Sequence, residues 1–143
     1  MKRSKMIFLL LSLILTANLF CINIKAAEGY EYTDSLALAE KLNAGFVMAR
    51  KPGKLPAETI EETYTKEYGV DSIQVHKDAI DENDIVLLHD DLLATGGTMA
   101  AAHRLVKKCG AKQTYINFVI ELEELNGRKA FPENVEITSL LVK

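Results

Sequence analysis

A segment that combines acidic residues with glycines follows one of the most apolar runs of the chain. Residues 85–88 are all aliphatic, and two adjacent carboxylates, Asp90 and Asp91, come shortly afterwards. A Thr-Gly-Gly-Thr sequence then occupies residues 95–98 and leads into a segment with helical periodicity. In an open α/β sheet, ligands bind beyond the carboxyl ends of the strands, where this turn is expected to lie. The segment therefore predicts a ligand site between a buried strand and a helix.

The glycines and threonines of this turn suit a phosphate group. Gly96 and Gly97 allow backbone N–H groups to turn toward an anion, and the helix that follows would add its partial positive charge. Thr95 and Thr98 can add hydroxyl donors. A P-loop or a dinucleotide-binding turn is excluded, because the segment has neither a Gly-Lys-Ser/Thr sequence nor G-x-G-x-x-G.

The two carboxylates would repel a phosphate and must therefore bind something else. Asp90 and Asp91 suit sugar hydroxyl groups, which donate to carboxylates, and they also suit a hydrated Mg²⁺ ion. Together with the turn they predict a ribose 5-phosphate pocket. The simpler alternative makes Thr98 a helix N-cap and Gly-Gly an ordinary loop, but capping leaves the two acids at the strand end unexplained.

Length and composition place this segment in one acidic globular domain. The chain has 143 residues, of which 48% are hydrophobic and 26% are charged. Its 17 basic and 20 acidic residues give a net charge of -3, which argues against nonspecific binding of nucleic acid. Cys21 and Cys109 alone cannot form a disulfide framework or a thiolate zinc site. The histidines form no H-x-x-x-H pair, so a protein-held transition metal is not expected.

Strand-like and helix-like segments alternate beyond residue 28, which predicts an α/β fold with a parallel, doubly wound sheet. The patterns predict strands at residues 46–49, 85–88, 115–120 and 135–142, a hairpin from residues 63–65 and 72–76, and helices at residues 35–42 and 99–108. His89 and His103 are expected to be packing residues. Glu121, Glu123 and Glu124 are expected at the charged start of a helix.

The first 27 residues differ from the remainder. Basic residues precede an uncharged apolar run over residues 6–24, and residues 25–27 read Lys-Ala-Ala. This order is typical of a secretory signal peptide or a short membrane anchor. A buried first helix is the alternative, but the run has no polar face. The sequence thus predicts a signal-like or anchor-like segment at residues 1–27 and a separate domain at residues 28–143.

Several motifs resemble those of one enzyme family. The Asp90–Thr98 segment is similar to the phosphoribosyl pyrophosphate (PRPP) signature of type I phosphoribosyltransferases. The resemblance covers residues 35–143. Further motifs narrow it to adenine phosphoribosyltransferases: Ala-Arg-Lys-Pro-Gly-Lys-Leu-Pro at residues 49–56, Lys-Glu-Tyr-Gly at 66–69, His-Lys-Asp-Ala-Ile at 76–80, Leu-Leu-Ala-Thr-Gly-Gly-Thr-Met at 92–99, and Glu121-Leu122 with Leu-Asn-Gly-Arg at 125–128.

This resemblance implies the fold, the reaction and the partners of the family. It implies the type I phosphoribosyltransferase sheet and the transfer of ribose 5-phosphate from PRPP to adenine, which gives AMP and pyrophosphate in purine salvage. It also implies Mg²⁺ as a cofactor that is bound mainly through PRPP, near Asp90 and Asp91, without direct protein ligands. Such enzymes are usually cytoplasmic homodimers, whereas the segment at residues 1–27 would imply export or a membrane anchor.

The resemblance also implies roles for individual residues. Asp90 and Asp91 would face the ribose diol, and the turn would hold the 5-phosphate. Glu67 is similar to the proposed acid/base that manages a purine proton, and Tyr68 would cover the sugar, on a polar hairpin at residues 58–72 that acts as a lid. The PRPP-binding segment comprises Asp90, Asp91, Leu92, Leu93, Ala94, Thr95, Gly96, Gly97 and Thr98. A basic loop would contact pyrophosphate, in some members across the dimer interface. This loop comprises Arg50, Lys51 and Lys54. For Glu67, Lys51 and Lys54 the alternative is a solvated surface charge.

The amino-terminal part departs from the family. The apolar segment stands in place of a hood that helps to bind adenine and of one strand of the sheet. Glu28 occupies the position of an arginine that grips pyrophosphate. We therefore expect a sheet without the hood and without that strand, and impaired activity. The alternatives are a noncatalytic module that binds PRPP or AMP, and an exported or membrane-anchored domain with another function.

Overall fold

The chain is built around a parallel sheet, a helix that covers it and a separate hairpin. The computed structural model describes residues 6–11, 39–66 and 69–143. Its elements are the strands β1 (Met6–Leu11), β2 (Gly45–Ala49), β3 (Thr59–Lys66), β4 (Gly69–His76) and β5 (Ile85–Leu93), the helix α2 (Gly97–Lys108), the strand β6 (Gln113–Glu121), the short 3-10 helices η1 (Glu123–Leu125) and η2 (Gly127–Ala130), and the strand β7 (Ile137–Val142).

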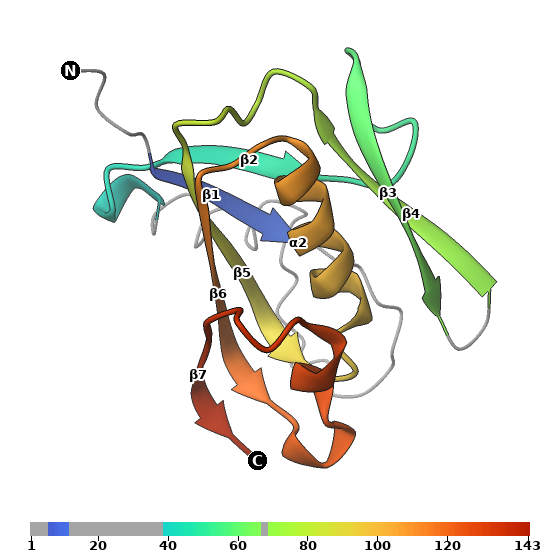
Figure 1. Ribbon diagram of the computed structural model, residues 1–143, viewed down its shortest axis with the longest axis vertical. Helices are drawn as coiled ribbons and strands as arrows, with labels where there is room; N and C mark the ends of the chain where they lie inside the picture. Colours follow the sequence, from blue (N-terminus) through green and yellow to red (C-terminus); the bar gives the residue numbers. More distant parts are fainter. Residues whose placement is uncertain (1–5, 12–38, 67–68) are drawn as a thin grey trace, which may run out of the picture.

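The strand order in the sheet is β2-β1-β5-β6-β7, and each pair of neighbouring strands is parallel. β3 and β4 form an antiparallel hairpin of their own. Figure 1 shows α2 lying over the sheet with the hairpin beside it. The predicted α/β fold, its parallel sheet and the hairpin are therefore confirmed. Residues 39–41 are helical and Leu42 already lies in a turn, whereas residues 35–38 of the expected helix lie outside the described residues.

The sheet is not short of a strand at its centre. We expected the apolar amino-terminal run to leave one strand position empty, but Met6–Leu11 forms β1 between β2 and β5. A central strand of a parallel sheet is covered on both faces and is therefore a continuous apolar run, which the sequence Met-Ile-Phe-Leu-Leu-Leu supplies. The domain division at residue 27 stays a prediction. Among the described residues, no helix combines the length and the apolar character needed to cross a membrane.

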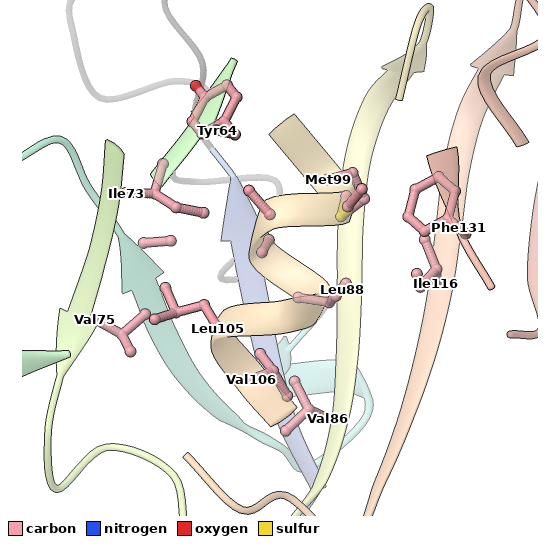
Figure 2. Close-up of a cluster of buried hydrophobic side chains, with 14 of the residues drawn as sticks. Tyr64, Ile73, Val75, Val86, Leu88, Met99, Leu105, Val106, Ile116 and Phe131 are labelled. Atoms are coloured by element: carbon pink, nitrogen blue, oxygen red, sulfur yellow. The ribbon is translucent and has the colours of Figure 1, made fainter. Parts of the chain in front are cut away.

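Helix α2 forms the middle of the hydrophobic core. Every residue from Met99 to Val106 is buried except Arg104. In Figure 2, Leu105 and Val106 lie between the side chains of β4 and those of β5. Burial of one such aliphatic side chain contributes about 1.5–3 kcal/mol. His103 is buried as well, and this burial lowers the pKa of its imidazole, in agreement with the expected packing role.

The ends of α2 are set by glycines and basic residues. The N-cap is Gly96, which has a left-handed φ of 78°, and no side chain caps the helix. Thr98 lies inside the first turn, so the interpretation of Thr98 as the N-cap is wrong. At the other end, Lys107 and Lys108 lie in the last turn, where cations interact favourably with the helix dipole.

The hairpin is anchored to α2 by a buried carboxylate. Glu62 on β3 is only 8% exposed, and its Oε1 accepts a hydrogen bond of 2.6 Å from Arg104 Nε. Lys108 forms an ion pair with the other carboxylate oxygen. These hydrogen bonds hold the pKa of Glu62 below its usual range, against the opposing effect of burial. The apolar side chains of Tyr64, Ile73 and Val75 complete the interface between the hairpin and the core.

We predict that Glu62→Gln destabilises the protein in a pH-dependent way. The native pKa of Glu62 is lowered, so its contribution is complete above the pH at which an unfolded glutamate titrates, about 4.3, and is lost as the pH falls through the native pKa. Glu62→Gln should lower the free energy of unfolding by about 1–3 kcal/mol near neutral pH. Urea denaturation should show this difference shrinking as the pH falls below 4.3, approximately.

The matched control is Glu82→Gln, because Glu82 is exposed in the loop before β5. This variant should unfold like the wild type at each pH. If the Glu62→Gln difference stays constant through the acidic range, the ionised carboxylate is not what anchors the hairpin.

Candidate functional site

Strand β5 extends beyond its apolar part and carries both candidate carboxylates. The sequence predicts that the strand ends at Leu88, but it continues to Leu93, because Asp90, Leu92 and Leu93 remain paired with β6. Asp90 is half-buried, and its Oδ1 accepts a hydrogen bond of 3.0 Å from the Asp91 N–H. Asp91 is exposed. The carboxylates therefore project from the edge of the sheet rather than from a loop.

The chain turns after β5 and enters α2 with its N–H groups available for a ligand. The first N–H groups of a helix have no intrahelical partner, and α2 has no acidic residue in its first turn. Thr95 is exposed and Thr98 is half-buried. Backbone donors, the positive end of the helix dipole and two hydroxyl groups together can bind an oxyanion. This local geometry supports the phosphate-binding role predicted for the turn.

The turn at residues 94–96 is in backbone contact with η2. A Cβ atom at Gly96 would lie 2.4 Å from the carbonyl oxygen of Gly127, and a Cβ atom at Gly127 would lie 2.2 Å from the carbonyl oxygen of Ala94. Neither position has room for a side chain. The turn and η2 therefore fix each other's position.

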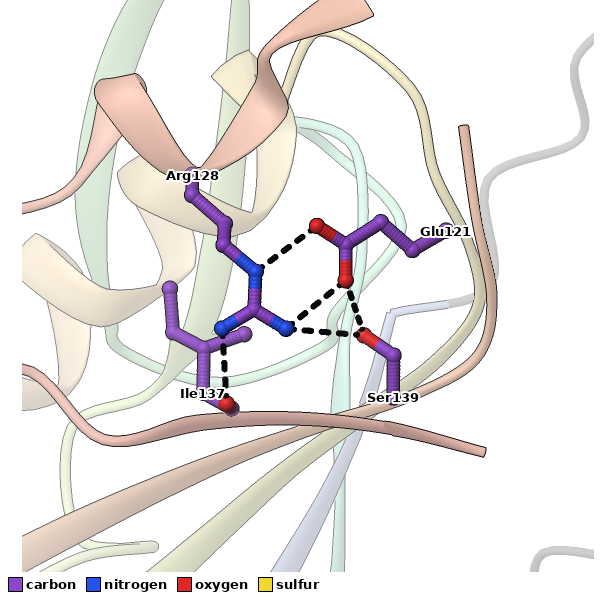
Figure 3. Close-up of polar contacts among 4 residues, drawn as sticks. All are labelled: Glu121, Arg128, Ile137 and Ser139. Atoms are coloured by element: carbon purple, nitrogen blue, oxygen red, sulfur yellow. Dashed lines mark hydrogen bonds and ion pairs between the residues drawn. The ribbon is translucent and has the colours of Figure 1, made fainter. Parts of the chain in front are cut away.

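An ion pair between Arg128 and the buried carboxylate of Glu121 holds η2 in place. Arg128 donates from Nε to Glu121 Oε1 and from one terminal nitrogen to Glu121 Oε2, both at 2.7 Å. Its other terminal nitrogen donates to the Ile137 carbonyl oxygen at 3.0 Å, and Ser139 Oγ donates to Glu121 Oε2 at 2.6 Å. Figure 3 shows the guanidinium group joining η2 to the end of β6 and to β7. The pairing lowers the pKa of Glu121 and raises that of Arg128.

The sequence analysis missed this pair. It placed Glu121, Glu123 and Glu124 at the start of a helix, but Glu121 ends β6, and the other two residues begin the 3-10 helix η1. Glu121 is only 5% exposed. Strand alternation gives no signal for this burial, because Glu121 shares its phase with the exposed residues of β6 and not with the buried Ile116 and Phe118.

The three basic residues of the predicted pyrophosphate loop follow β2. Because β2 and β5 belong to one parallel sheet, their carboxyl ends lie at the same edge, and the loop leaves the sheet on the side of the Asp90–Thr98 segment. The backbone of Arg50 bridges to Gln74 of the hairpin. Lys51 forms an ion pair of 3.3 Å with Asp71, whereas Lys54 is exposed. The pyrophosphate-binding role of these residues stays a prediction.

The candidate catalytic residues Glu67 and Tyr68 lie outside the described residues, as does Glu28. The described part of β3 nevertheless approaches the ligand turn, because the Thr65 carbonyl oxygen lies 3.9 Å from a Cβ position at Gly97. The hairpin predicted to form a lid is thus packed on α2 along β3.

The fold and this site together define a class of protein: an α/β protein with two carboxylates and a glycine turn at the carboxyl end of a parallel strand. Residues 35–132 match the phosphoribosyl transferase domain family, and the chain belongs to this family. The resemblance that the motifs carry is therefore confirmed.

Individual relatives are adenine phosphoribosyltransferases. The chain is 76% identical over 105 residues to that of Phocaeicola vulgatus, an alignment that covers 73% of this chain and 60% of the relative. It is 66% identical over 104 residues to that of Bacteroides thetaiotaomicron, covering 73% and 59%. The solved adenine phosphoribosyltransferase of Rhodothermus marinus has a TM-score of 0.78 at 37% identity, over 99% of this chain and 71% of that one. The chain matches about 60% of the length of these curated relatives.

We predict that the contact between the turn and η2 tolerates no side chain. Gly127→Ala would place a Cβ 2.2 Å from a backbone oxygen, so something must shift, and the free energy of unfolding should fall by about 1–3 kcal/mol. Ligand binding at the turn should weaken as well. Thermal unfolding and calorimetric titration with AMP measure the two effects.

Gly110→Ala is the matched control, because Gly110 has a left-handed φ of 89° but no atom within 4 Å of its Cβ position. It should lose about 1 kcal/mol from backbone strain alone and leave ligand binding unchanged. Equal loss of AMP affinity in both variants would show that the contact with η2 does not shape the turn.

Proposed function

We propose that the chain acts as an adenine phosphoribosyltransferase, which transfers ribose 5-phosphate from PRPP to adenine and releases AMP and pyrophosphate. The observation that carries this proposal is the Asp90–Thr98 segment, in which two carboxylates at the end of β5 lead directly into a glycine turn and the start of α2. The relatives support the same activity, since their names specify adenine phosphoribosyltransferase.

Each part of the substrate has a suitable partner at this edge of the sheet. The backbone N–H groups and hydroxyls of residues 94–98 would hold the 5-phosphate. Asp90 and Asp91 would accept hydrogen bonds from the ribose hydroxyls, and Arg50, Lys51 and Lys54 would meet the pyrophosphate. Adenine would enter opposite the leaving group.

The reaction breaks the bond between the sugar C1 and pyrophosphate and forms a bond from C1 to N9 of adenine. Positive charge develops on the sugar ring and negative charge on the leaving group, so a basic loop favours the transition state. Glu67 would manage the proton on the purine nitrogens, and Tyr68 would cover the sugar and exclude water. These two roles rest on the motif at residues 66–69.

The residues fit a Mg²⁺ ion that is held mainly by PRPP. Among the described residues, no group of three or more acidic, histidine or cysteine side chains forms a protein-only metal site. Asp90 and Asp91 offer two adjacent carboxylates close to where the substrate would lie. When bound, the ion would neutralise charge on the departing pyrophosphate.

The remaining parts of the proposal concern setting and assembly. We expect a homodimer that works in purine salvage in the cytoplasm, with the basic loop near the partner's site. The solved relative from Saccharomyces cerevisiae, with a TM-score of 0.75 at 36% identity over 96% of this chain and 67% of that one, is complexed with adenine and an imino-altritol bisphosphate. Its ligands are a purine base and a bisphosphate, which are the chemical classes that the proposed pocket would bind.

We predict that Asp91→Asn combined with Thr95→Val weakens AMP binding by about 2–4 kcal/mol, since the pair removes a charge-assisted contact and a hydroxyl contact. Both side chains are exposed, so the fold should be unaffected. Calorimetry measures the affinity, and steady-state formation of AMP from adenine and Mg-PRPP measures the activity. Wild-type binding without turnover would favour a noncatalytic binding module, and unchanged affinity in the double variant would place the ligand elsewhere.

We also predict that Lys54→Ala weakens the binding of PRPP more than that of AMP, by about tenfold or more, because only PRPP carries the pyrophosphate. Lys54 is the most informative of the three basic residues, since Lys51 already pairs with Asp71. Lys112→Ala is the control, because Lys112 is exposed just before β6, at the opposite edge of the sheet. Equal losses of PRPP and AMP affinity would separate Lys54 from the pyrophosphate.

A further inference from the structure

The proposed phosphate turn has few interactions that could hold it by themselves. Residues 94–96 form no regular structure, and α2 begins there without a side-chain cap. The position of the turn is set from outside by the backbone of Gly127. The Gly127 backbone lies so close to the turn that neither Gly127 nor Gly96 could carry a side chain. A shift of η2 would therefore shift the N–H groups that the turn offers to a ligand.

Helix η2 is itself too short to be rigid alone. It has four residues, and its N-cap Asn126 adopts a left-handed φ of 52°. Phe131, which follows it, is buried in the core, but a buried ring fixes the chain after η2 and not the orientation of Gly127. The residue next to Gly127 is Arg128, whose guanidinium group donates to four acceptor atoms on three residues, Glu121 of β6 and Ile137 and Ser139 of β7.

We propose that Glu121 and Arg128 are positioning residues for the phosphate turn, acting through Gly127. The carboxylate of Glu121 is almost wholly buried at the end of β6, the neighbour of β5 in the sheet. This carboxylate accepts hydrogen bonds from Arg128 and from the Ser139 hydroxyl, and its position is fixed by the sheet. The ion pair with Arg128 therefore fixes the position of η2 relative to the sheet. The backbone contact of Gly127 in turn fixes the position of the phosphate turn relative to η2. Its role in binding a 5-phosphate rests on the function proposed above.

Arg128→Lys is the main test, because it keeps the positive charge and loses the planar fork that reaches Glu121 and the Ile137 carbonyl together. In the full chain, the first hydrogen-bonded amides of α2, at residues 100–102, of which Ala100 donates to the Gly96 carbonyl oxygen at 2.9 Å, should exchange hydrogen at least tenfold faster. The dissociation constant for AMP should rise about tenfold, and the KM for PRPP should rise with little change in kcat. The KM for adenine should stay within twofold of the wild-type value.

Two further variants keep the test decisive. Val75→Ala removes buried methyl groups from β4, away from η2, and reports what loss of stability alone does to the same amides. Ser139→Ala removes only the hydroxyl that donates to Glu121, so it should fold normally and show a smaller effect of the same kind, about two- to fivefold.

The outcomes separate this inference from the proposed function. Faster exchange at residues 100–102 in Arg128→Lys, but not in Val75→Ala, supports the inference. Equal exchange and equal AMP affinity in Arg128→Lys and the wild type would overturn it and leave the transferase proposal standing. If the wild type binds no AMP, the proposed function fails, and the exchange rates still decide whether Arg128 holds the turn.

Discussion

The backbone contact between Gly96 and Gly127 is the constraint on which the rest of the site depends. Two segments that are thirty residues apart in the chain meet there without any side chain between them. This contact requires that β5 end at Leu93 and that the chain turn at once into α2. It also requires that the first residue of η2, Gly127, face the turn. Chemistry at the start of α2 is possible only if both segments are held from outside.

Two buried glutamates supply that support from opposite sides. Glu62 ties the hairpin to the second half of α2, and Glu121 ties η2 to the sheet. Desolvation of a carboxylate costs several kcal/mol, so such pairs add little net stability, while removal of one partner is expensive. Their use here is geometric, because each arginine reaches across elements that apolar contacts alone would allow to slide.

The sequence was informative wherever one local pattern determined the structure. Apolar runs placed β2, β5, β6 and β7, alternation placed the hairpin, and the glycines of residues 95–98 placed the turn at the start of α2. Tertiary pairing decided the rest. β5 continues past its apolar part because Asp90 and Leu92 find partners on β6, and β1 fills the sheet because a buried central strand has the same apolar composition as a signal peptide. Glu121 was missed because a buried acid is recognised only with its arginine, which lies seven residues further on.

The order of residues along β5 resolves an electrostatic conflict within the proposed pocket. Unit charges of like sign about 4 Å apart repel by about 4 kcal/mol at an effective dielectric constant of 20, and the energy is inversely proportional to the distance. Asp90 and Asp91 lie on β5, and Leu92 and Leu93 separate them from the turn. Each strand residue adds about 3.3 Å to the distance between the carboxylates and an anion at the turn. These two residues therefore reduce the repulsion to less than half of its value at about 4 Å. A free phosphate gains nothing from the acids at this separation. A ligand that carries hydroxyl donors one sugar ring away from its phosphate would satisfy both ends of the segment, so this order of residues is compatible with the sugar phosphate that we propose.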